Sequence, residues 1–107
     1  MNRIANKAAR SMVQNLTPFE GSNLFARINT NADEQWYVVY SYGEHHPLFI
    51  NAGGVWFENE DKFSLSTSRH RSQAHPMGNT VLLSTAWMRA LAQRGFAAIA
   101  KERILHG

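Results

Sequence analysis

The segment from Trp36 to Thr67 constrains the fold more than any other part of the chain. It holds two of the three Trp, all three Tyr and three of the six Phe, and apolar residues recur at every second position. This spacing is typical of strands with one buried face. The interruptions at 43–47, 51–54 and 59–62 are rich in residues that favour turns. Such short connections favour antiparallel neighbours, because parallel strands need crossovers of about a dozen residues.

We therefore predict an α+β fold in a single domain, residues 1–107, built on an antiparallel meander of four or five short strands. Strands are expected at 24–28, 36–42, 48–50, 55–57 and 63–67. Residues 80–83 fit either a last edge strand or an extended lead-in. An N-terminal amphipathic helix is expected over 4–16, a short helical turn over 69–74, and one or two C-terminal helices divided at Gly95. We expect these helices to pack on one face of the sheet.

Composition narrows the class of protein. The chain has no Cys, which excludes disulfides, thiolate nucleophiles and Cys-based zinc sites. It contains no apolar run long enough to span a membrane, and its first residues lack the apolar core of a signal peptide. We expect a cytoplasmic protein without membrane contact.

Charge is distributed unevenly along the chain. Residues 23–62 carry two bases and six acids, whereas residues 63–107 carry six bases and one acid. Residues 1–22 carry three bases and one acid, so the acidic charge lies on the predicted meander with basic charge on either side of it. This layout either steers a charged partner or serves solubility alone.

Catalysis and metal binding have little support in the sequence. Ser66, Thr67 or Ser68 could act as a nucleophile with His70 or His75 as its base, but no Gly-x-Ser-x-Gly elbow is present. The five His show no His-Glu-x-x-His spacing, and Gly53-Gly54 has no helix after it to bind phosphate. We expect no enzyme, no cofactor and no metal site.

Two groups of charged residues are the candidate binding residues. The acidic turn contains Glu58, Glu60 and Asp61, which could mimic phosphates in the basic groove of a nucleic-acid-handling partner. The basic segment 69–76 carries Arg69, His70, Arg71 and His75, which could contact nucleic acid directly. A second interpretation makes residues 62–76 a hydrogen-bonded scaffold, with Asp61 paired to Arg69.

Five runs form a recognisable series: YVVYSYG at 37–43, HPL at 46–48, DKFS at 61–64, TSRH at 67–70 and SQAHP at 72–76. Together with Trp56 and Asn59, they resemble a family of small uncharacterised proteins encoded by bacteriophages, plasmids and their bacterial hosts. The resemblance covers roughly residues 8–92 and implies a mobile genetic element, but it brings no catalytic residue.

Small proteins from that setting often act by stoichiometric binding. We therefore expect a non-enzymatic protein that binds a host protein and inhibits a defence system of the anti-CRISPR or anti-restriction type. The alternative is a small nucleic-acid-binding or regulatory module that uses the basic segment 69–76. The sequence does not decide between a monomer and a homodimer.

Overall fold

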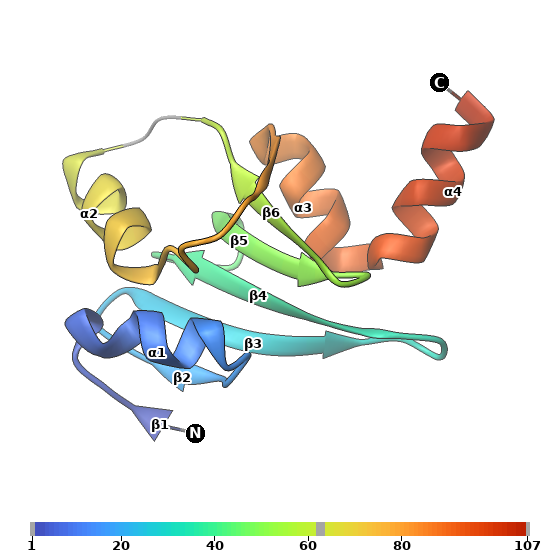
Figure 1. The fold of residues 1–107 in the computed structure, drawn as a ribbon. Helices are drawn as coiled ribbons and strands as arrows, with labels where there is room; N and C mark the ends of the chain where they lie inside the picture. The colour runs from blue at the N-terminus through green and yellow to red at the C-terminus, as the bar shows by residue number, and fades with distance from the viewer. Residues whose placement is uncertain (1, 62–63, 107) are drawn as a thin grey trace.

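The computed structural model describes residues 2–61 and 64–106, with side chains as far as residue 101, and these residues form seven strands and four α-helices (Figure 1). The strands are β1 (Asn2–Arg3), β2 (Phe19–Glu20), β3 (Leu24–Thr30), β4 (Gln35–Ser41), β5 (Pro47–Ala52), β6 (Val55–Asn59) and β7 (Val81–Leu83). The helices are α1 (Ala9–Gln14), which follows a 3-10 turn at Asn6–Ala8, then α2 (Leu65–Ala74), α3 (Thr85–Arg94) and α4 (Phe96–His106).

One mixed sheet holds all seven described strands, side by side in chain order. The pairs from β2 to β6 are antiparallel, which confirms the predicted meander over β3 to β6. The edge strands β1 and β7 run parallel to their neighbours, so a purely antiparallel sheet of four or five strands is wrong. The reason is that α1 and α2 each provide a crossover, and a crossover lets the next strand run in the same direction.

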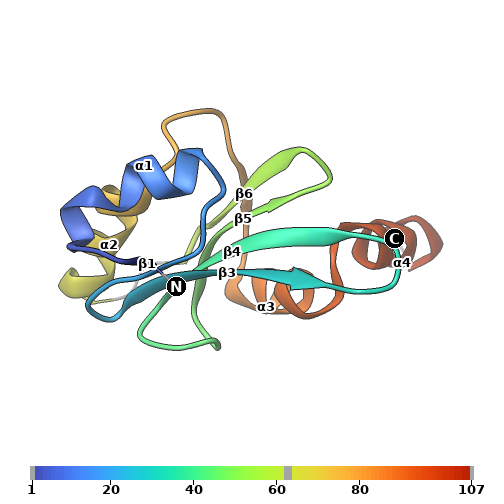
Figure 2. The ribbon, with the colours of Figure 1, turned by 90° about the horizontal axis from the view of Figure 1, so that it is seen from below.

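Helices cover both faces of the sheet, as Figure 2 shows. On one face, α1 and α2 pack over the core cluster that includes Tyr37 and Val39. On the other, α3 and α4 pack over the cluster that includes Trp36 and Val38. The prediction that all helices share one face is therefore wrong. Apolar residues occupy both alternating sets of β4, and a strand of this kind is buried on both sides.

The last strand predicted at 63–67 is also wrong where it can be checked, because α2 begins at Leu65; Phe63 lies outside the described residues. Ser64 is the N-cap, and its side chain accepts a hydrogen bond from the Thr67 backbone N–H at 3.3 Å. The hydrogen bond of this cap favours a helix more strongly than the sequence alternation at 63, 65 and 67 favours a strand. Helix α2 is polar and buries Thr67, His70 and Ala74.

The N-terminal helix is shorter than predicted and ends in a strained turn. The Thr17 N–H bonds to the Met12 carbonyl at 2.9 Å, and the Leu16 N–H bonds to the Val13 carbonyl at 3.0 Å. This is the Schellman ending of a helix, in which the residue after the cap adopts a left-handed conformation and is usually Gly. Here that residue is Leu16, with φ +51°.

The C-terminal helices are confirmed on both sides of Gly95. Ser84 caps α3 by accepting a hydrogen bond from the Trp87 N–H at 3.3 Å, and Gly95 ends it with φ +86°. Glu34 then accepts a hydrogen bond from the Ala97 N–H in the first turn of α4, at 2.9 Å. A Cβ atom on Gly95 would lie 2.8 Å from the Trp36 ring and 2.6 Å from the Glu34 carboxylate.

Replacing Gly95 by Ala is expected to lower the free energy of unfolding by about 1–3 kcal/mol, because the new side chain combines positive φ with contact to Trp36. Urea denaturation measures the change. The control is Gly78→Ala, where a Cβ meets nothing within 4 Å. Equal effects of the two substitutions would contradict the placement of Gly95.

Candidate functional site

Glu58, one of the expected binding residues, lies in a network within the protein, and its side chain is only 13% exposed. Its carboxylate accepts a hydrogen bond from Thr80 Oγ1 at 2.7 Å and lies 3.2 Å from His75 Nε2. Arg71 Nε approaches the same carboxylate at 3.9 Å. The other ring nitrogen of His75 accepts a hydrogen bond from the Met77 N–H at 2.9 Å. These contacts join β6 to α2 and to the segment that leads into β7.

Asp61 and Arg71 also have partners within the chain. The Arg71 guanidinium donates hydrogen bonds to the backbone carbonyls of Asn59 and of Asp61. The Asp61 carboxylate accepts a hydrogen bond from the Thr85 N–H at 2.8 Å, at the start of α3. Hydrogen bonding by Thr85 lowers the pKa of Asp61. Arg71, and not the predicted Arg69, is therefore the arginine that binds the backbone at residues 59–61.

The seven expected binding residues do not come together on one exposed surface. Glu60 and Arg69 are exposed, whereas His70 is buried. The side chains of the other four are engaged in the contacts described above. Within residues 62–76, the scaffold interpretation therefore accounts for His70, Arg71 and His75.

A polar group that the sequence did not indicate lies between β4 and α2. Ser41 Oγ is 2.8 Å from His70 Nδ1 and 3.5 Å from Thr67 Oγ1, and all three residues are buried. Burial, followed by the charge of Arg69, lowers the pKa of His70 below its ordinary value of 6.5. One feature of the sequence could have indicated this buried polar group. Ser41 is a polar residue on the same strand face as Tyr37 and Val39.

Next to this group, Tyr42 stands between two hollows, of which the first is mainly polar. The first, of about 290 Å³, is lined in part by Asn23, Ser66, Arg69, His70 and Gln73. The second, of about 330 Å³, is lined in part by Ser41, His45, His46, Ser64 and Thr67. Tyr42 lines both hollows, is 51% exposed and has φ +67°, which is unusual for a bulky residue.

A hydroxyl and an imidazole are in contact at Ser41 and His70, 2.8 Å apart. Ser41 is only 1% exposed, and a nucleophile must reach its substrate. Thr67 is buried against Ser64 and Ser41, and His75 is bound to Glu58 and Met77. Within the part of the chain that the structure describes, no three His, Asp or Glu side chains are grouped so as to hold a metal ion.

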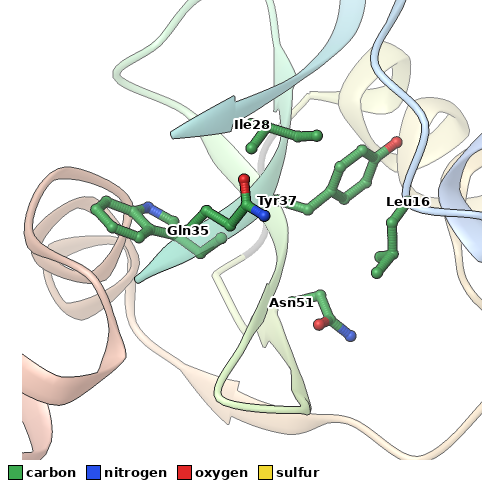
Figure 3. A pocket seen from close by; sticks show the side chains of 6 residues that line it. Leu16, Ile28, Gln35, Tyr37 and Asn51 are labelled. Atoms are coloured by element: carbon green, nitrogen blue, oxygen red, sulfur yellow. The ribbon is translucent and has the colours of Figure 1, made fainter. Parts of the chain in front are cut away.

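An apolar groove of about 210 Å³ lies at the opposite end of β4, beyond the end of α1 (Figure 3). The strand register places Ile28, Tyr37, Asn51 and Trp56 in one row across β3 to β6. Figure 3 shows Leu16, Gln35 and three of these residues around the opening. Ile28 is 44% exposed and Leu16 is 41% exposed. We call this surface the Leu16 groove, and none of its lining residues is charged.

Comparison with known proteins does not assign this chain to a family. No protein-family model, no curated protein and no solved structure matches this chain. Among the described residues, no helix is long and apolar enough to cross a lipid bilayer.

Glu58→Ala is expected to lower the free energy of unfolding by about 1–3 kcal/mol, because it removes the acceptor of Thr80 and the partner of His75 and Arg71. Chemical denaturation measures the loss. The matched control is Glu60→Ala, which removes the same charge from an exposed position and should leave the midpoint unchanged. An equal loss in both variants would contradict the internal role of Glu58.

The lowered pKa of His70 predicts acid sensitivity. The unfolded chain takes up this proton near pH 6.5, whereas the folded protein takes it up only at lower pH. Stability is therefore expected to fall as the pH drops below about 7.

His70→Gln should flatten this dependence, measured as the urea midpoint at each pH. The pKa of His46 is also lowered, chiefly by burial, but His46 is present in both proteins, so the difference reports on His70. Identical slopes for the two proteins would overturn the expectation.

Proposed function

We propose that this protein binds a host protein stoichiometrically, without catalysis, and so inhibits a defence system of the CRISPR or restriction type. The resemblance to phage and plasmid proteins supplies the setting. The Leu16 groove supplies the contact surface, in place of the acidic turn, whose side chains largely serve the fold. The exposed apolar side chains of the groove are Leu16 and Ile28, and apolar side chains without charged neighbours are typical of the centre of a protein interface.

The observation that carries this proposal is the position of Leu16. A left-handed conformation costs a residue with a Cβ about 1–2 kcal/mol, which Gly would avoid. Leu16 is nevertheless 41% exposed, so its side chain is not fully used in the core. Backbone strain of this kind often occurs at functional positions. A strained residue that presents an apolar side chain to an open groove supports a contact with an apolar side chain of a partner.

The alternative, a nucleic-acid-binding module that uses segment 69–76, has less support. Arg71 and His75 contact carbonyls and a carboxylate of the protein itself. His70 is buried against Ser41. Arg69 is the remaining base of that segment, and a single exposed base is a weak electrostatic attraction for a duplex.

Leu16→Asn is expected to abolish inhibition while keeping the fold. Asn tolerates the left-handed conformation but removes the apolar side chain, so the free energy of unfolding should stay within about 1 kcal/mol of wild type. The measurement is phage plating efficiency on a panel of host strains. Each strain carries one CRISPR or restriction system and is tested with and without the protein.

Wild type should restore plaques in at least one strain, and both Leu16→Asn and Ile28→Asp should fail there. The matched control is Leu65→Asp, which adds a charge at an apolar position that is 81% exposed on α2, and it should still protect. Absence of protection in every strain would overturn defence inhibition. A wild-type dimer in solution that Leu16→Asn converts to a monomer would show that a second copy fills the groove, which would also overturn the proposal.

A further inference from the structure

The first of the two hollows around Tyr42 has the lining of an anion site. Arg69 is exposed at the first hollow, together with the hydroxyl of Ser66 and the amide of Asn23. Arg side chains bind phosphate oxygens through several N–H groups, and hydroxyl and amide groups add hydrogen bonds. None of the described lining residues is an acid, and the nearby Glu44 carboxylate lies 3.7 Å from Arg27. A negatively charged group therefore meets no opposing carboxylate in the lining.

One acceptor in the first hollow lacks a partner. Gln73 Oε1 is buried and makes no hydrogen bond. A buried polar atom without a partner is unfavourable, and such atoms are rare in native proteins. The oxygen itself has less than 1 Å² of accessible surface, so it is closed to a ligand in the hollow. The exposed Arg69, Ser66 and Asn23 therefore define the lining, which suits a ligand with an anionic group.

The Tyr42 ring supplies a stacking surface. Its backbone N–H donates to the Asn23 carbonyl at 2.9 Å, and Asn23 also has positive φ, at +56°. Gly or Asn would make the same backbone turn without strain. The ring packs against His70, with centroids 5.3 Å apart, yet Tyr42 stays 51% exposed. Its role is therefore not explained by burial alone.

We propose that Tyr42 and Arg69 bind a nucleotide unit, with the base stacked on the Tyr42 ring and the phosphate at Arg69. Every base has a π face and aromatic side chains bind it by stacking, while a neighbouring cation holds the phosphate. The two hollows, of about 290 and 330 Å³, have the size of small-ligand sites. The unit comes either from a free nucleotide or from a single strand. This site lies at the opposite end of β4 from the Leu16 groove and does not depend on it.

The test is isothermal titration of the full chain, at low and at physiological salt, with four probes. The probes are inorganic phosphate, a nucleoside, a nucleoside monophosphate and a single-stranded octanucleotide. Tyr42→Asn, which keeps the left-handed backbone, and Arg69→Gln are each expected to weaken nucleotide binding about ten-fold or more. The control Lys101→Gln removes one charge on α4 and should change affinity less than about two-fold.

The probes distinguish the two sources of the nucleotide. Equal binding of the monophosphate and the octanucleotide supports a free nucleotide, and binding of the octanucleotide alone supports a single strand. Binding of inorganic phosphate as tight as that of the nucleotide, unaffected by Tyr42→Asn, would overturn the proposal, as would no binding at low salt. Thermal unfolding of each variant separates lost binding from lost folding, and Leu16→Asn should bind the nucleotide like wild type.

Discussion

The burial of β4 on both faces is the constraint on which the rest of the structure depends. Trp36 and Val38 lie against α3 and α4, while Tyr37 and Val39 lie against α1 and α2. A strand without solvent on either face needs a full-length partner on each edge, because its buried backbone groups must form hydrogen bonds. β3 and β5 are those partners. The two layers of helices then follow, since each face of the sheet has to be covered.

The two helical crossovers, α1 and α2, cover one face of the sheet, and the crossover through α2 uses many of the charged side chains. Arg71 binds carbonyls at the end of β6, Glu58 binds Thr80 and His75, and Asp61 accepts from the first turn of α3. The helix itself has almost no apolar face, so polar contacts with β4 and β6 replace much of the usual hydrophobic packing. A segment rich in Arg and His can therefore be part of the scaffold, although its composition resembles a binding loop.

Both proposed contact surfaces place a strained residue at an opening. Leu16 and Tyr42 adopt left-handed backbone conformations and remain about half exposed, one at each end of the face covered by α1 and α2. Because both side chains are largely exposed, we expect the fold to tolerate a change at either position. The Leu16 groove is mainly apolar and suits a protein partner, whereas the first Tyr42 hollow is mainly polar and suits an anionic ligand.

The sequence by itself determined the local elements: the strands β3 to β6 through their period of two, the turns through Gly and Asn, and the helix boundary at Gly95. These depend on neighbours in the chain, so spacing and turn residues predict them. Only the tertiary structure decided which faces were covered, that β1 and β7 run parallel, and that α2 replaces a strand after Ser64. It also decided that Ser41 meets His70 and that Glu58 is enclosed, because these contacts join residues 17 to 29 positions apart, and no local pattern encodes such pairings.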